Sequence, residues 1–137
     1  MTTNQTLPAC VNPAHLHDPR PNGYSTATVV PSGARLAHIS GQGGQDRHGN
    51  LSPDFAAQVD QAYANLMAVL EAMGAGPRNV AKLTTYVVDH DMSKLGPLTR
   101  AVVGLFGDHL PVQTLVGVSK LAVDGMLFEV EAIAVVD

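Results

Sequence analysis

The last strand predicted in this chain has apolar side chains on both faces, which constrains the fold more than any other feature. Successive side chains of a strand point to opposite faces of its sheet. One face carries Phe128, Val130, Ala132 and Ala134, and the other carries Leu127, Glu129, Glu131, Ile133 and Val135. Helices can cover one of these faces, and a chain of 137 residues has little else to cover the second. We therefore expect another subunit to supply that cover.

The rest of the pattern predicts a single α+β domain over residues 1–137, with the element order β-β-α-β-α-β-β. Several prolines make residues 1–22 an irregular lead-in. Alternating and β-branched residues predict strands at 24–30, 35–40, 80–88, 113–119 and 127–136. Pro31-Ser32-Gly33 is expected to join the first two as a hairpin. Two helices should cover one face of the resulting mixed sheet.

Apolar residues recur at helical spacing in two segments. Ser52-Pro53-Asp54 offers the first helix an N-cap, a proline at the first helical position and an acid in the first turn. Its apolar positions are Phe55, Val59, Ala62, Leu66, Val69, Leu70 and Met73. Gly74 should end this helix. A second helix is predicted over 97–106, with a stripe of Leu98, Val102 and Leu105 and with Gly107 as its C-terminal cap.

Composition argues against several function classes. Eight Lys and Arg against twelve Asp and Glu leave no basic footprint for a nucleic-acid partner, and six aromatic residues show no base-stacking pattern. No apolar run reaches membrane-spanning length, and residues 1–12 lack a basic start followed by an apolar block. A single cysteine, Cys10, excludes a disulfide framework or a thiolate metal cage. We expect a cytoplasmic protein.

Motifs for cofactors, metals and nucleophiles fail on their details. In the segment from Gly41 to Asp46, the third glycine of a dinucleotide fingerprint would fall at Asp46, so its glycines are expected to serve tight turns. The pair His15 and His17 has no neighbouring ligands, which favours surface or packing histidines. Ser119 lacks the second glycine of a nucleophile elbow. No metal or organic cofactor is predicted.

Glu129 is the exception, because it lies in a mostly apolar strand. Buried carboxylates are rare unless they are paired or used. One interpretation is an ion pair with Lys or Arg across a subunit interface. The other is a carboxylate whose pKa is raised by desolvation, so that it passes protons near neutral pH. The residues alone favour neither, and the role of Glu131 is equally open.

Several short segments between Gly23 and Val136 have a recognisable order and spacing. They are Gly23-Tyr24-Ser25, Ile39-Ser40-Gly41-Gln42 followed by Asp46 and Gly49, Gln58 with Asn65-Leu66 and Leu70, Val80 to Asp89, Leu110-Pro111 and Glu129 to Ala134. Together they resemble the reactive-intermediate deaminase (Rid, YjgF-like) family, some of whose members carry the label L-PSP endoribonuclease. The resemblance implies a chorismate-mutase-like fold in a homotrimer, with the sheets forming a central barrel and the helices outside.

The resemblance also implies a site. In the best-known branch, clefts between subunits hydrolyse enamines and imines to a keto acid and ammonia, without metal or organic cofactor. Glu129 matches the carboxylate of the family, Tyr24 the tyrosine of the cleft, and Ser40 and Gly41 the wall beside it. The ligand is therefore expected to be a small molecule.

One departure from the family pattern concerns substrate docking. Deaminating members carry an arginine in a Pro-Ala-Arg-Ser segment, where this chain has Pro111-Val112-Gln113-Thr114. An amide at Gln113 offers hydrogen bonds but no charge. Two classes of function follow for a site with Glu129, Gln113, Thr114 and Tyr24. One is a hydrolase with a narrower or neutral substrate, and the other is a trimer that binds a metabolite or a protein without turnover. Ribonuclease activity is not expected.

Overall fold

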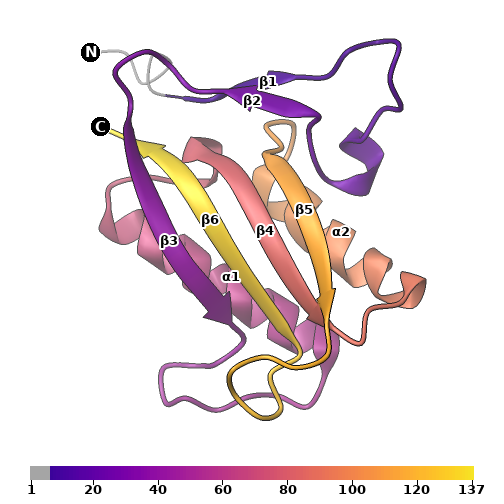
Figure 1. Cartoon of the computed structure of the whole chain (residues 1–137). Helices are drawn as coiled ribbons and strands as arrows, with labels where there is room; N and C mark the ends of the chain where they lie inside the picture. Colours follow the sequence, from indigo (N-terminus) through magenta and orange to yellow (C-terminus); the bar gives the residue numbers. More distant parts are fainter. Residues whose placement is uncertain (1–6) are drawn as a thin grey trace.

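Four strands form one mixed sheet in the computed structural model, which describes residues 7–137. In spatial order they are β3 (Arg35–Gly43), β6 (Phe128–Val136), β4 (Val80–Val88) and β5 (Val112–Val118). The central strand β6 is antiparallel to both neighbours, and β4 and β5 are parallel. Helices α1 (Phe55–Ala72) and α2 (Leu95–Phe106) cover one face (Figure 1). The predicted α+β fold is confirmed; residues 1–6 of the predicted lead-in lie outside the described part.

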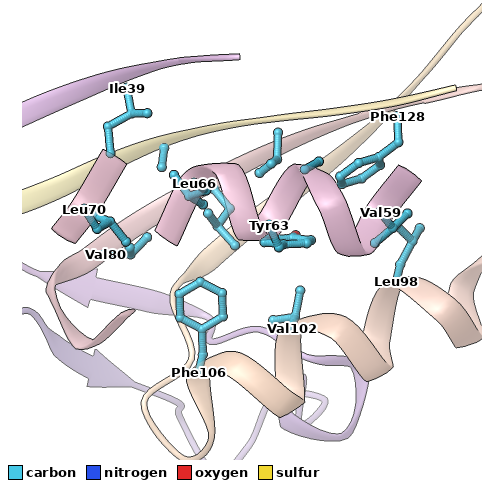
Figure 2. Packing of buried hydrophobic residues seen from close by; sticks show 14 of the residues in the cluster. Ile39, Val59, Tyr63, Leu66, Leu70, Val80, Leu98, Val102, Phe106 and Phe128 are labelled. Carbon is cyan, nitrogen blue, oxygen red and sulfur yellow. The ribbon is translucent and has the colours of Figure 1, made fainter. Parts of the chain in front are cut away.

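The core lies between this sheet and the two helices. Along α1, Val59, Tyr63, Leu66 and Leu70 are completely or almost completely buried, and they follow helical spacing. The Tyr63 ring lies between two phenylalanines, with its centroid 5.8 Å from that of Phe128 on β6 and 6.5 Å from that of Phe106 on α2. Figure 2 shows these rings linking the helices to the sheet. Aromatic contacts of this kind add to the apolar area that folding removes from water.

The starts of the helices differ from the prediction in detail. The N-cap of α1 is Asp54 rather than Ser52, because the Asp54 carboxylate accepts a hydrogen bond from the Ala57 N–H (2.9 Å). Helix α2 begins at Leu95, directly after the short 3-10 turn η4 (Met92–Lys94), and so earlier than predicted. Its buried stripe is Leu98, Val102 and Phe106, whereas Leu105 is exposed. Leu98, Val102 and Phe106 are spaced i, i+4, i+8 and therefore share one helix face, which explains why Phe106 rather than Leu105 is buried.

The predicted hairpin of residues 24–30 with 35–40 is wrong. Strand β2 (Ala27–Val29) pairs instead with β1 (Ala9–Val11), a strand missed in the lead-in, and forms a separate two-stranded ribbon. The turn at 31–34 does form, but the ribbon crosses the end of the main sheet (Figure 1). The bonds that hold it there include one from the Ser25 N–H to the Pro111 carbonyl (3.0 Å) and one from Thr28 Oγ1 to the Ala81 carbonyl (2.9 Å). Tertiary hydrogen bonds have overridden the local hairpin signal.

Short 3-10 turns complete the chain at η2 (Arg20–Asn22) and η3 (Pro77–Asn79). Asn79 joins η3 to the sheet, since its side chain accepts from the Gly76 N–H (3.0 Å) and donates to the Val135 carbonyl (2.8 Å). Within residues 7–137, no helix combines the length and the apolar character needed to cross a membrane.

The face of β6 that points away from the helices is only partly open. Ile133 and Leu127 are half-buried on it, as the alternating pattern predicts. Val135 departs from the prediction, because its own chain already buries it completely. The register of β4 against β6 shifts between Val80 and Lys82, close to this position. The apolar surface left for a second copy is therefore smaller than the sequence suggests, and the trimer stays a prediction.

Candidate functional site

The predicted site residues lie in two separate places. The first is a cavity of about 480 Å³ between β5, α2 and the segment that enters β2. Its walls are apolar, formed by Met92, Leu95, Leu98 and Leu115. Its polar groups are those of Asn22, Tyr24, Thr99 and Gln113. Of these lining residues, sequence analysis identified Tyr24 and Gln113 as site residues. The apolar walls carry no motif, because they come from η4, α2 and β5 and line a common cavity only when the helix packs on the sheet.

Gln113 and Tyr24 reach this cavity from different elements of the same chain. Gln113 lies near the start of β5 and points to the helix side of the sheet, where its Nε2 donates to Thr85 Oγ1 (3.4 Å). Tyr24 follows the 3-10 turn η2 and is held by the neighbouring Ser25–Pro111 bond. Thr114 is exposed, and strand alternation turns it to the opposite face, so it does not line the cavity.

The second place is the pair of strands β3 and β6, where Gly41 and Glu129 are in contact. A Cβ built on Gly41 would lie 2.6 Å from both Cδ and Oε2 of Glu129, so only glycine lets the carboxylate rest on the strand backbone. Ser40 and Gly41 are exposed and lie where the β3–β6 register shifts, between Ile39 and Gln42. Irregularities of this type redirect side chains beside functional sites.

The two carboxylates of β6 differ in their partners. Tyr86 donates its hydroxyl to Glu131 Oε1 (2.7 Å), and this bond is the main cause that raises the pKa of Tyr86. Glu129 is half-buried, and within residues 7–137 no comparable bond engages its carboxylate. Of the two carboxylates of β6, Glu129 is therefore the one without a side-chain hydrogen-bond partner among residues 7–137.

The two places lie on opposite sides of the sheet. Glu129 alternates with the core residues Phe128 and Val130, so it points away from the helices, whereas Gln113 points toward α2. They also lie toward opposite edges of the sheet. Gln113 is on the outer strand β5, whereas Glu129 is on β6, which neighbours the other outer strand, β3. One chain therefore does not bring Glu129 and Gln113 together.

Two polar residues in the segments that resemble the Rid family have structural roles. The buried Gln58 side chain donates to the carbonyls of Ser52 (2.7 Å) and Gly125 (2.8 Å) and accepts from the Leu127 N–H (2.8 Å). Asn65 donates to the carbonyls of Gly43 (3.0 Å) and Gln45 (2.8 Å). Both connect α1 to the loops that flank Gly41 and Glu129, and so support the second place indirectly.

Among residues 7–137, no group of three or more His, Cys, Asp or Glu side chains is placed to hold a metal ion. His15 and His17 are both exposed in the segment before η2. The Cys10 thiol donates to the Leu110 carbonyl (3.3 Å), which contributes to anchoring β1.

Sequence comparisons identify relatives along most of the chain. The profile of the family described as "Endoribonuclease L-PSP" matches residues 17–136. A RutC family protein of Aquifex aeolicus is 32% identical over 120 residues, covering 85% of this chain and 92% of that protein. A 2-iminobutanoate/2-iminopropanoate deaminase of Escherichia coli K12 is 31% identical over 90 residues, 64% of this chain and 68% of that protein. The match to the RutC family protein PH0854 of Pyrococcus horikoshii, 36% identical over 81 residues, spans 59% of this chain and only 62% of that protein.

Solved structures show the same fold. The structure of the Rid family protein YyfB from Yersinia pestis, described as a protein of unknown function, superposes with a TM-score of 0.89 at 34% identity, covering 94% of this chain and 98% of that one. RidA from an Antarctic Psychrobacter gives a TM-score of 0.68 at 28% identity and covers 96% and 99%. The two structures cover similar shares of this chain, so the higher TM-score shows that its backbone follows that of YyfB more closely than that of RidA.

Proposed function

The chain belongs to the Rid (YjgF-like, L-PSP) family, and on that premise we propose that it hydrolyses a small enamine or imine, with a substrate range altered by Gln113. In this proposal three copies form a homotrimer in the cytoplasm, and each site lies between two copies. Family relatives named as imine deaminases support the reaction type. The single observation that carries the proposal is the Glu129 carboxylate, which rests against Gly41 and, unlike that of Glu131, has no side-chain hydrogen-bond partner among residues 7–137.

The chemistry needs one group that moves protons next to the imine carbon. Water adds to the C=N bond, the nitrogen leaves as ammonia and a C=O bond remains. Glu129 would take a proton from the attacking water and return it to the departing nitrogen. Gln113 and Tyr24 would orient the far part of the molecule by hydrogen bonds. Ser40 and Gly41 would form the wall beside the reacting carbon.

A ring of copies would unite the two places. The strands β3 and β5 are the free edges of the sheet, and Glu129 and Gln113 lie near opposite edges. When one edge of a copy meets the other edge of the next, the contact is head-to-tail, and it closes into a trimeric ring when successive copies are rotated by one third of a turn. Each interface then brings Glu129 of one copy toward Gln113 of its neighbour. The half-exposed Ile133 and Leu127 would be covered in the same step.

The test measures ammonia release from freshly generated 2-aminoacrylate and from imines of uncharged carbonyl compounds. Wild-type protein should accelerate at least one of them, and Glu129→Ala should not. Trimers assembled from a mixture of Glu129→Ala and Gln113→Ala chains should regain activity, because some interfaces pair an intact Glu129 with an intact Gln113. Activity that is retained in Glu129→Ala, or mixed trimers no more active than their parents, would contradict the proposal.

A second candidate is ligand binding without turnover. The cavity beside Gln113 favours it, because its walls are apolar and its polar groups are uncharged, as in many pure binding sites. Under this alternative, ligands bind the cavity of wild type and Glu129→Ala equally, and no imine is hydrolysed by either.

A further inference from the structure

The cavity beside Gln113 has no positive charge among its lining residues in the described chain. Lys94, next to the wall residue Leu95, is committed elsewhere: its Nζ donates to the carbonyls of Val88 (2.9 Å) and Asp89 (2.7 Å). Arg20 forms an ion pair with Asp18 (2.9 Å). Arg100 lines a separate groove on the outer side of α2. A carboxylate entering the cavity would lose hydration without gaining a cation.

The orientation of the Gln113 amide adds a second restriction. Its Nε2 donates to Thr85 Oγ1 (3.4 Å), and Thr85 is completely buried on β4, the inner strand next to β5. One of the two amide N–H donors is thereby engaged, which fixes the direction of the amide and leaves the carbonyl oxygen Oε1 and the second N–H for a ligand. A carbonyl oxygen accepts hydrogen bonds, so it attracts N–H or O–H groups and repels a carboxylate.

We propose that this cavity selects an uncharged ligand that presents a hydrogen-bond donor, such as a carbamoyl group, to Gln113 Oε1, and that Thr85 is the positioning residue for this choice. The inference rests on the proposed function only in placing the ligand at this site. The apolar side chains Leu95, Leu98 and Leu115 would take the hydrocarbon part of the ligand. A site built to pair with a donor discriminates strongly against an analogue without it, because its own polar group is left unpaired.

A matched pair of probes tests the choice. 3-Phenylpropanamide and 3-phenylpropanoate have the same shape and differ in charge and in the donor group. Their dissociation constants are measured on the wild-type assembly by ligand-observed NMR at pH 7. We expect the amide to bind about tenfold more tightly or better, a ratio that corresponds to roughly 1.4 kcal/mol. Equal binding, or tighter binding of the carboxylate, would overturn the inference.

Variants separate orientation from simple packing. Gln113→Arg should invert the ratio, because a guanidinium binds carboxylates through two charge-assisted bonds. Thr85→Val removes the acceptor for Nε2 and lets the amide turn, so the ratio should fall toward one. Thr85→Ser keeps the hydroxyl and should restore the ratio. If Thr85→Val and wild type show the same ratio with weaker binding of both probes, Thr85 is only structural and the inference fails.

Two further measurements keep the outcomes distinct. The Gln113→Glu variant presents only hydrogen-bond acceptors to the ligand, and it can be measured even if the Thr85 variants do not fold. It should still bind the amide probe more tightly than the carboxylate probe. Loss of this preference in Gln113→Glu would contradict the inference. Both probes lack a C=N bond, so the ratio does not depend on hydrolysis. If the protein prefers the amide probe but hydrolyses no imine, the proposed reaction is refuted and the inferred ligand preference is supported. If it hydrolyses an imine but prefers the carboxylate probe, the proposed reaction is supported and the inferred ligand preference is refuted.

Discussion

The two halves of the candidate site contrast in how they are built. The Glu129 half lies on two adjacent strands, β3 and β6, and depends on a close contact between a carboxylate and Gly41. The Gln113 half is a cavity formed by β5, α2 and the segment before β2, with apolar walls and uncharged polar groups. In the proposed reaction the first half moves a proton through the Glu129 carboxylate. The second half holds the ligand, and in the described residues its lining contains no carboxylate, histidine or cation. The difference suggests a division of labour between chemistry and recognition.

The largest expected effect is on the Glu129 half. Glu129→Gln keeps the shape of the side chain and removes its ability to take a proton, so imine hydrolysis should fall about 10²-fold or more. Its matched control is Glu131→Gln on the same face, where Tyr86 engages the carboxylate. The measurement is initial ammonia release at saturating substrate. A comparable loss in both variants would show that the face as a whole, rather than Glu129, supports activity.

Gly41→Ala should have the next largest effect. The added Cβ would lie 2.6 Å from the Glu129 carboxyl, so the side chain must move. A displaced catalytic group costs up to about 10²-fold in rate, and we expect about tenfold, with binding of 3-phenylpropanamide unchanged. Gly104→Ala on α2 is the control, since no atom lies within 4 Å of its new Cβ. Unchanged turnover in Gly41→Ala would mean that the contact does not position Glu129.

Tyr24→Phe should affect the other half more modestly. It removes one hydroxyl from the cavity, and a single neutral hydrogen bond contributes about 1 kcal/mol. Binding of the amide probe should therefore weaken about fivefold, as seen in its dissociation constant. Tyr86→Phe, on the opposite face, serves as the comparison and should leave that constant unchanged. If the effects were exchanged, the ligand would bind on the open face instead.

The smallest effect is a change in tyrosine titration. The bond to Glu131 raises the pKa of Tyr86, since the hydrogen bond favours the protonated phenol. Any stability from this bond is therefore present at neutral pH and is lost as the pH rises through the folded pKa. In Glu131→Gln the pKa of Tyr86 should fall, measured by NMR on labelled tyrosine rings. In Glu129→Gln it should change less, because Glu129 contributes only a minor charge interaction. A larger fall of the Tyr86 pKa in Glu129→Gln than in Glu131→Gln would show that the Tyr86 hydroxyl interacts mainly with Glu129.

Most of the sheet and both helices could be predicted because their signals are local. Strand β4 matches its predicted bounds at 80–88, and Phe128, Val130, Ala132 and Ala134 face the core as their alternation indicates. The partner of β2 could not be predicted in the same way. A turn sequence indicates where the chain reverses, but Ser25 and Thr28 find their hydrogen-bond partners in Pro111 and Ala81, distant in sequence.

The candidate site shows the same division. Glu129, Tyr24 and Gln113 were identified from residue type and family pattern, while the apolar walls of the cavity were not, because ordinary leucines carry no functional signal. Val135 was predicted on the open face and is buried by its own chain, next to a register shift that alternation alone does not reveal.

The sequence by itself determined the family, the α+β element order and the chemical types at the site, since periodicity and residue identity are local properties of the chain. The tertiary structure alone decided that Glu129 and Gln113 face opposite sides of one sheet, and that Thr85 engages the nitrogen of the Gln113 amide. The physical reason is that strand pairing and side-chain hydrogen bonds join residues distant in sequence, and their geometry exists only after the chain has folded.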